Sequence, residues 1–243
     1  MAMVPITARL GLILSASNLC VEPFFRELAP AQLAIHPTRM QMASQVRADF
    51  AETAAEATEV ARLVAQAKVD VIDLQATGFV MSLGAEAETR CIQGIEDATG
   101  IPAYTATQGL MEALRALEVR RVLLITPFDD EPTAEERAYI EGQGFELTAA
   151  VGLALGGGPI TAKTPYDTWL QAAIAHDTPD AQAIVLSGSN TTQTDAIQGI
   201  EDALGKPAVT SVQAALWAGV KRVKGKLGDF TPEAALGRLG QTL

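Results

Sequence analysis

Two copies of one seven-residue sequence divide this chain. The segment Ile92-Gln93-Gly94-Ile95-Glu96-Asp97-Ala98 recurs unchanged as Ile197-Gln198-Gly199-Ile200-Glu201-Asp202-Ala203. The correspondence continues at Gly100/Gly205, Pro102-Ala103/Pro207-Ala208, Thr105/Thr210 and Gln108/Gln213. Seven consecutive identities rarely arise by chance, so the repeat predicts two structurally equivalent halves. The alternative is that one efficient combination of helix, glycine turn and proline-started strand is used twice, which says nothing of chemistry.

Short apolar runs alternate with longer stretches rich in Ala, Glu and Leu, as is typical of βαβ units around a parallel sheet. Four runs are apolar on both faces and predict buried strands: Leu10–Leu14, Val69–Leu74, Val122–Thr126 and Ala183–Leu186. Apolar residues three and four apart predict helices at Ala51–Ala67, Gly109–Ala116, Ala134–Gly142 and Pro165–Ala175. Thr133 and Glu136 fit a capping box at a helix start. We predict an α/β protein of two pseudo-symmetric halves, each a mostly parallel sheet flanked by helices.

The predicted strands also place a site. We assign residues 1–117 and the C-terminal segment 213–243 to the first half, and residues 118–212 to the second. The strands end in small or polar residues: Ser15-Ala16-Ser17-Asn18, Gln75-Ala76-Thr77-Gly78, Pro127-Phe128-Asp129-Asp130 and Ser187-Gly188-Ser189-Asn190. Ligands of α/β sheets bind at the carboxyl ends of strands. We therefore expect the site in the cleft between the halves.

Charge and composition exclude several classes of partner. The formal net charge is −11, from 18 lysines and arginines against 29 aspartates and glutamates, so we expect no nucleic-acid partner. The apolar run Leu10–Leu14 is too short for a signal peptide or a membrane span, so we expect a cytoplasmic protein without membrane contact. Two scattered cysteines and two histidines lack the spacing of metal ligands, and we expect neither a metal site nor a disulfide framework.

Four stretches of the sequence resemble a known superfamily. They are Gly11-Leu12-Ile13-Leu14-Ser15-Ala16-Ser17-Asn18 with Glu22 shortly after; Ala98-Thr99-Gly100-Ile101-Pro102; Glu112-Ala113-Leu114-Arg115-Ala116-Leu117 with Val119-Arg120-Arg121-Val122; and Leu186-Ser187-Gly188-Ser189-Asn190 with Asp195-Ala196-Ile197. These residues resemble the aspartate/glutamate racemase superfamily, and within it the maleate cis-trans isomerases and arylmalonate decarboxylases. The likeness covers nearly the whole chain and implies the fold of two α/β halves.

The resemblance implies chemistry without a cofactor and a departure from the usual residues. Such enzymes place a cysteine at the strand end of one or both halves, where its thiol or thiolate acts on the carbon beside a substrate carboxylate. The matching positions here are Ala76 and Gly188, so both cysteines are replaced. Neither a methyl group nor a hydrogen exchanges protons, which puts two-base racemisation and thiol addition in doubt. Phe128 stands where these enzymes usually have a substrate-binding tyrosine.

Without the two cysteines, the resemblance still implies a carboxylate-binding site formed by hydroxyls, carboxamides and main-chain amides. The expected substrate-binding residues are Asn18, Ala76, Thr77, Gly78, Phe128, Gly188, Ser189, Asn190 and Thr191. Thr77 and Ser189 are the hydroxyl candidates for a catalytic role. Cys20 is a third candidate, because a helix N-terminus would lower the pKa of its thiol. The alternative for Cys20 is a packing role.

Three other reactive side chains have structural interpretations. Cys91 lies at the front of the first repeat helix, and we assign it to packing. His36 falls in a predicted loop, residues 34–39, and His176 lies near the end of a predicted helix. Each imidazole could act as a base at neutral pH, but nothing places either in the cleft, and we assign both to the surface.

Two functions of different classes remain. The first is a cofactor-independent racemase, isomerase or decarboxylase acting on a small mono- or dicarboxylic acid. Decarboxylation suits the missing thiols best, because loss of CO₂ needs an apolar pocket and an oxyanion hole, and only the later protonation needs an acid. The second is a catalytically degenerate protein that binds a carboxylate as a sensor or carrier. A different reaction in the same cleft is a third possibility. By resemblance, we also expect a homo-oligomer.

Overall fold

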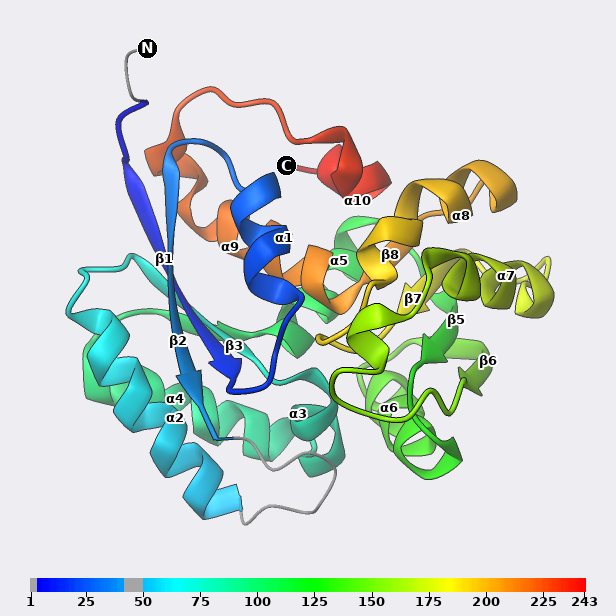
Figure 1. Ribbon diagram of the computed structural model, residues 1–243, viewed down its shortest axis with the longest axis horizontal. Coiled ribbons are helices and arrows are strands. Elements are labelled where there is room, and N and C mark those ends of the chain that lie inside the picture. The colour runs from blue at the N-terminus through cyan, green and yellow to red at the C-terminus, as the bar shows by residue number, and fades with distance from the viewer. Residues whose placement is uncertain (1–3, 42–49) are drawn as a thin grey trace.

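The computed structural model describes residues 4–41 and 50–243, which form two four-stranded parallel sheets (Figure 1). The first sheet has the strand order β2-β1-β3-β4 and the second has β6-β5-β7-β8. Every neighbouring pair in both sheets is parallel. Each strand of the first sheet therefore has an equivalent at the same place in the second. The predicted α/β class with two equivalent halves is confirmed.

The first sheet and the helices that follow its strands come from the N-terminal part of the chain. These elements are β1 Ala8–Ser15, α1 Val21–Leu28, β2 Leu33–Met40, α2 Phe50–Ala65, β3 Val71–Gln75, α3 Thr77–Leu83, α4 Ala85–Thr99, β4 Ala103–Thr105 and α5 Ala106–Ala116. The central strands β1 and β3 are almost wholly buried because helices cover both faces of the sheet.

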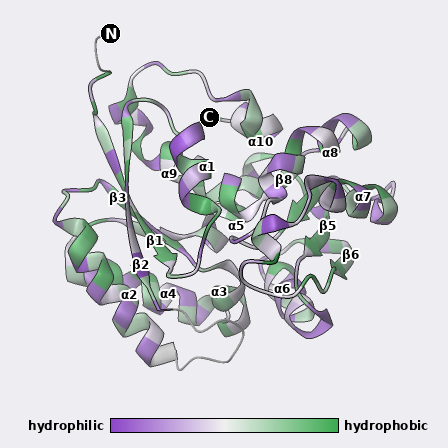
Figure 2. Cartoon of the chain, in the orientation of Figure 1, coloured by the Kyte–Doolittle hydropathy of each residue, from purple (hydrophilic) through white to green (hydrophobic). Residues whose placement is uncertain are grey.

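The second sheet repeats this arrangement in the C-terminal part. Its elements are β5 Arg121–Thr126, α6 Asp130–Gly142, β6 Glu146–Gly152, the 3₁₀ helix η1 Thr161–Lys163, α7 Tyr166–His176, β7 Ala183–Leu186, η2 Gln193–Ala196, α8 Ile197–Leu204, β8 Ala208–Thr210, α9 Ser211–Leu227, η3 Ala234–Leu236 and α10 Gly237–Gly240. The outer helices α2 and α7 carry both hydrophilic and hydrophobic residues, as helices with one face toward solvent should (Figure 2).

Helices α5 and α9 pack together within the core that joins the two sheets. That core combines side chains of β1 and β3 with those of β5 and β7, for example Leu12 with Val185. Gly109 of α5 permits the close approach, since a Cβ there would lie 3.1 Å from the Ala214 carbonyl of α9. The Tyr104 hydroxyl donates to the Ala215 carbonyl at 2.8 Å and fixes α9 against the first sheet. The two halves therefore share one apolar core.

The repeated residues perform the same structural tasks in both halves. Gly100 and Gly205 end α4 and α8 in the left-handed conformation, with φ of 68° and 67°. The Glu96 carboxylate accepts the N–H of Ala103, the first residue of β4, at 2.9 Å. Glu201 accepts the N–H of Ala208 in β8 at 3.1 Å. The repeat therefore encodes a helix end anchored to the next strand, and its identical residues have no need of a chemical role.

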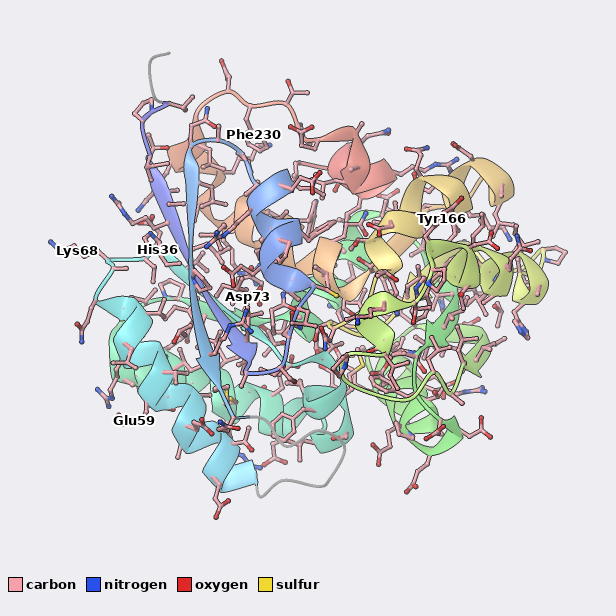
Figure 3. The ribbon with its side chains drawn as sticks, in the orientation of Figure 1. His36, Glu59, Lys68, Asp73, Tyr166 and Phe230 are labelled. Atoms are coloured by element: carbon pink, nitrogen blue, oxygen red, sulfur yellow. The ribbon has the colours of Figure 1, made fainter. Side chains whose placement is uncertain are left out.

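Two local predictions are wrong. Helix α6 begins at Asp130, so Thr133 lies inside it, and its hydroxyl donates to the Asp129 carbonyl instead of capping the helix. A complete capping box occurs instead at Thr210 and Gln213, where the two residues bond each other's main-chain N–H groups. His36 lies in strand β2 rather than in a loop, because the edge strand pairs along β1 in continuous register (Figure 3).

Candidate functional site

Two asparagines link the carboxyl ends of the two sheets. Asn18, in the loop after β1, donates from Nδ2 to the Ser189 carbonyl at 3.2 Å. Asn190, in the loop after β7, accepts the Leu19 N–H on Oδ1 at 2.8 Å and donates to the Ser17 carbonyl at 3.4 Å. The structure therefore brings together three residues that the sequence predicted for the site.

Asn18 also holds the start of helix α1. Its Oδ1 accepts the N–H groups of Cys20 at 3.1 Å and Val21 at 3.0 Å, and the residue is only 1% exposed. A side-chain oxygen that accepts such orphan amides stabilises a helix N-terminus. Asn18 thus positions the loop and joins the halves, and its contact with a ligand stays a prediction.

Thr77 presents a buried hydroxyl at the end of β3. Ala76 is the residue that precedes α3, and Thr77 is the first residue of that helix. Thr77 is 1% exposed, and within residues 4–41 and 50–243 its Oγ1 has no hydrogen-bond partner. A buried polar atom without a partner is costly and uncommon in folded proteins. The hydroxyl hydrogen and both lone pairs of the oxygen are therefore available to bind a ligand.

Gly188, at the equivalent place after β7, has a backbone that suits glycine. Its φ is +124°, a conformation that other residues rarely adopt. A Cβ at this position would lie 3.3 Å from the ring of Pro127 and from the methyl group of Thr191. The Gly188 N–H donates to the Ser211 hydroxyl at 3.2 Å. The turn therefore has little room for a side chain at position 188.

A buried carboxyl group lies beside Gly78 and Phe128, and the sequence did not assign it to the site. A Cβ on Gly78 would lie 3.4 Å from Oε1 of Glu136 and 3.4 Å from Cζ of Phe128. Glu136 belongs to α6 and is 1% exposed. Burial raises the pKa of Glu136 to about 7, and the nearby Ser187 hydroxyl opposes that rise. In the sequence, the spacing of Glu136 from Thr133 suggested a capping box, so Glu136 was not predicted as a site residue.

Ser187 and Gln193 add further buried polar atoms after β7. Gln193 donates from Nε2 to the Ser187 carbonyl at 2.7 Å, and its own N–H donates to the Thr191 hydroxyl at 3.5 Å. Across the described part of the chain, the Ser187 hydroxyl and the Gln193 side-chain oxygen find no partner. Polar groups left open in this way mark a place where a ligand or water would bind. Neither residue could be selected from the sequence, because single Ser and Gln residues carry no motif.

Cys20 is not an activated thiol. Burial and the negative charge of Asp195 raise the pKa of Cys20 to about 11, so the expected lowering by a helix N-terminus is wrong. The physical reason is that burial disfavours the thiolate, the first amides of α1 already bond to Asn18, and the charge of Asp195 adds to the rise. Cys91 is buried in the core between the first sheet and helices α2 and α4, as predicted for a packing residue. Burial and Glu88 raise the pKa of Cys91 to about 11.

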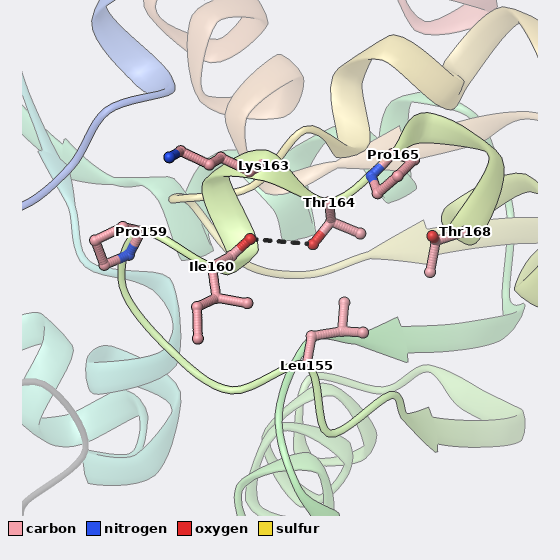
Figure 4. A pocket seen from close by; sticks show the side chains of 7 residues that line it. All are labelled: Leu155, Pro159, Ile160, Lys163, Thr164, Pro165 and Thr168. Atoms are coloured by element: carbon pink, nitrogen blue, oxygen red, sulfur yellow. Dashed lines mark hydrogen bonds between the residues drawn. The ribbon is translucent and has the colours of Figure 1, made fainter.

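One cavity lies next to the predicted site rather than in it. It has a volume of about 470 Å³ and is lined by Leu155, Pro159, Ile160, Lys163, Thr164, Pro165 and Thr168 (Figure 4). The segment that forms it contacts the site, because the Thr161 hydroxyl donates to the Asn190 carbonyl at 3.0 Å. The predicted residues Asn18, Thr77 and Gly188 are themselves buried. A second cavity, of about 400 Å³, lies at the junction of the halves, between Gly84 after α3 and Tyr139 of α6.

Asp73 forms a second buried acid group beneath this edge of the first sheet (Figure 3). It is fully buried on β3 and accepts a hydrogen bond from Gln75 Nε2 at 2.7 Å. Burial raises the pKa of Asp73 to about 7, while Gln75 and Arg222 act in the opposite direction. Asp73 lies on β3, four residues before Thr77, so its charge state affects the strand that leads into the site.

Over residues 4–41 and 50–243, no three His, Cys, Asp or Glu side chains converge as metal ligands. In the same part of the chain, every helix is too short or too polar to traverse a lipid bilayer.

The sequence of this chain is similar to a known enzyme family and to two of its relatives. The model of the arylmalonate decarboxylase family matches residues 10–235. An arylmalonate decarboxylase of Bordetella bronchiseptica is 29% identical over 157 residues, which is 64% of this chain and 65% of the relative, slightly less than two thirds of its length. A maleate isomerase of Pseudomonas putida is 25% identical over 226 residues, covering 88% of this chain and 90% of the relative.

Solved structures extend the likeness to the fold. A variant of the maleate isomerase from Pseudomonas putida S16, crystallised with maleate, superposes with a TM-score of 0.88 at 22% identity, over 97% of this chain and 98% of the other. A crystal structure of arylmalonate decarboxylase gives a TM-score of 0.84 at 23% identity, over 97% of this chain and 100% of the other. Because the family model spans nearly the whole sequence, this chain belongs to the arylmalonate decarboxylase family, which includes the maleate isomerases, within the aspartate/glutamate racemase superfamily.

Proposed function

We propose that this protein is a cofactor-independent enzyme acting on a small dicarboxylic acid, and that decarboxylation of a substituted malonate is its favoured reaction. The observation that carries the proposal is the buried, unpartnered hydroxyl of Thr77, placed at the carboxyl end of β3. Relatives named arylmalonate decarboxylase and maleate isomerase, one of them crystallised with maleate, support a dicarboxylate as the ligand class.

The chemistry required at such a site matches the groups that surround Thr77. Loss of CO₂ from a malonate leaves its electron pair on the remaining carboxylate as an enediolate, which hydrogen-bond donors stabilise in a water-excluded site. The Thr77 hydroxyl is such a donor, and the Phe128 ring beside Gly78 supplies an apolar wall. Ser189 and Thr191 stay candidates for further hydroxyl contacts.

The positions that match the family's cysteines are, in this proposal, Ala76 and Gly188. A thiol is therefore not the proton donor at either strand end, and Cys20 is protonated at neutral pH with a pKa of about 11. Racemisation and cis-trans isomerisation through a thiolate lose their usual groups. Decarboxylation loses only the acid that protonates the enediolate carbon after CO₂ has left, and solvent water can supply that proton, which is why this reaction is favoured.

A direct assay tests this proposal. Purified protein is incubated with phenylmalonate and with maleate, and release of CO₂ and formation of fumarate are followed. We expect turnover of phenylmalonate that decreases at least tenfold in Thr77→Val. Phenylmalonate turnover at the buffer rate, with the protein folded, would overturn the decarboxylase assignment.

A carboxylate-binding protein without chemistry is the second candidate. It is favoured by the backbone of Gly188, whose φ of +124° suits no thiol-bearing residue. Thermal stabilisation by phenylmalonate or maleate without any turnover would support this second function over the first.

A further inference from the structure

We propose that Glu136 is the group that recognises the ligand's carboxylate, by donating a hydrogen bond from its own neutral carboxyl, so that ligand binding is coupled to proton uptake. This inference rests on the proposed function, because it assigns the ligand-binding group of the same site.

Glu136 lies against Gly78, on the side where a side chain at position 78 would project. Oε1 of Glu136 and Cζ of Phe128 both lie 3.4 Å from the place where a Cβ on Gly78 would project. Glu136 comes from α6 of the second half, whereas Gly78 lies in α3 of the first half. The carboxyl group therefore lies between the halves, against the residue that follows Thr77 in the chain.

The carboxyl group has no partner within the protein. Both Oε atoms of Glu136 lack a hydrogen bond in the part of the chain that the structure describes, although the residue is 1% exposed. Ser187 lies close enough to affect its pKa, yet no hydrogen bond of ordinary geometry joins the two side chains. Unpaired burial of a carboxyl group is costly, and such groups in native proteins call for a ligand or a functional reason.

Glu88 is a buried glutamate with a structural role, and its hydrogen bonds provide a comparison for Glu136. Glu88 lies on α4 and is 5% exposed. One of its oxygens accepts the Thr105 hydroxyl, and the other accepts the Tyr139 hydroxyl of α6. Tyr139 is one helical turn from Glu136, so paired and unpaired glutamates occur at the same junction. The unpaired state of Glu136 is therefore a local property of the site.

The surroundings of Glu136 keep its carboxyl neutral up to about neutral pH. Burial raises its pKa to about 7, the neighbouring Glu135 adds to the rise, and Ser187 opposes it. Helix α3, packed against α6, carries no titratable side chain. On β6, the other element packed against α6, Glu146 is paired with Arg120 at 3.0 Å near the surface. No cation of these two elements therefore holds Glu136 ionised.

A neutral carboxyl group is suited to a carboxylate ligand. Its O–H donates to an acceptor-only carboxylate, whereas an ionised glutamate at the same place would repel it. Two carboxyl groups that share a site hold one proton between them. A dicarboxylate that binds above pH 7 must therefore take up a proton with it, and its affinity should fall about tenfold for each pH unit above 7.

Calorimetric titration with phenylmalonate and maleate tests this coupling. Each titration is run at pH 6 and pH 8 in two buffers of different ionisation enthalpy, which gives the number of protons taken up. We expect uptake to approach one proton at pH 8 in the wild type, and to approach zero in Glu136→Gln. Because an amide still donates a hydrogen bond, Glu136→Gln should keep its affinity from pH 6 to pH 8. Glu131→Gln, the matched control at an exposed glutamate of the same helix, should behave as the wild type does.

The outcomes separate the inference from the proposed function. Binding with equal proton uptake in the wild type and Glu136→Gln, or binding without pH dependence, would overturn the role of Glu136 and leave the dicarboxylate function standing. Failure of the wild type to bind either probe would overturn both. The infrared band of a protonated carboxyl, expected at pH 6 in the free wild type and lost in Glu136→Gln, tests the neutral state directly; its absence from the wild type contradicts the inference.

Discussion

Asn18 and Asn190 reach across the junction of the two halves in opposite directions, and each side chain bonds the main chain of the loop that carries the other. The two loops follow β1 and β7, which are central strands of equivalent sheets but are not equivalent strands, because β1 corresponds to β5 and β7 to β3. Asn18 is buried, whereas Asn190 is only half-buried. The two contacts therefore differ in strength despite their similar arrangement.

Alanine at position 18 should destabilise the protein more than alanine at position 190. Asn18→Ala removes the acceptor for two N–H groups of α1 and the bond to Ser189, and we expect a loss of roughly 2 kcal/mol. Asn190→Ala removes the Leu19 bond of 2.8 Å and two contacts of 3.4 Å, but at a half-buried residue where water can replace them, and should cost about 1 kcal/mol or less. Urea denaturation of both variants measures the difference. Equal losses would contradict the capping role of Asn18.

Removing the Thr77 hydroxyl should affect ligand binding and leave stability intact. Thr77→Val keeps the shape of the side chain, and the hydroxyl it removes has no partner among the described residues. We expect a change in unfolding free energy within about 0.5 kcal/mol and a loss of phenylmalonate affinity of about tenfold. Thr58→Val, whose hydroxyl donates to the Ala54 carbonyl at 2.9 Å on α2, is the control and should leave affinity unchanged. Unaltered affinity in Thr77→Val would remove Thr77 from the site.

Cysteine should be tolerated unequally at the two strand ends. Gly188→Cys forces a side chain onto a residue with φ of +124° and against Pro127, and should cost roughly 1–3 kcal/mol. Ala76 has a negative φ of −143° and already carries a Cβ, so Ala76→Cys adds only a sulfur atom to a tight core. Thermal denaturation should therefore place Gly188→Cys below Ala76→Cys. The reverse order would show that the turn at 188 adjusts freely.

The sequence predicted the sheets and the loops that meet at the site because both depend on local pattern. The apolar run Ala183–Leu186 has the same limits as β7, and the polar ends of β1 and β7 proved to be joined. Strand β3 begins two residues after the predicted Val69, since hydrophobicity alone does not fix where pairing with β1 starts.

Other features depend on contacts between distant residues. Glu136 lies eight residues from Phe128 along the chain, and only the approach of α6 to Gly78 makes it part of the site. Edge strand β2 was missed because His36, Pro37 and Thr38 interrupt its apolar pattern, although it pairs along the full length of β1. The pKa of Cys20 depends on Asp195 of the other half, which a local motif cannot reveal.

Cys20 should react slowly with thiol reagents at neutral pH. Burial and Asp195 raise its pKa from 9.0 to about 11, so its thiolate fraction should be about a hundredfold below that of an unperturbed cysteine. Asp195→Asn removes the nearby charge and should accelerate labelling. Stopped-flow labelling from pH 7 to pH 10 measures the rate, and Cys20→Ser separates it from that of Cys91. Rapid labelling of Cys20 at pH 7 would restore it as a nucleophile candidate.

Asp73 should make the protein less stable as the pH rises toward neutrality. The folded chain holds this proton up to a pKa of about 7, whereas the unfolded chain releases it near 3.8, so stability falls between those values and is constant above them. Asp73→Asn removes that titration and should raise the unfolding free energy at pH 8 by on the order of a few kcal/mol. Denaturant titrations at pH 5 and pH 8 compare the two proteins.

Asp70 provides a control of opposite sign close to Asp73. Burial alone would raise its pKa, but hydrogen bonds and charges from Lys226 and the Arg9 N–H leave the pKa of Asp70 below its usual value. A depressed carboxyl pKa contributes stability above the unfolded value and loses it as the pH falls. Asp70→Asn should therefore destabilise the protein at pH 8, where Asp73→Asn stabilises it. If both variants shifted stability in the same direction at pH 8, burial of Asp73 in its neutral form would be wrong, and β3 would hold an ionised carboxylate beneath Thr77.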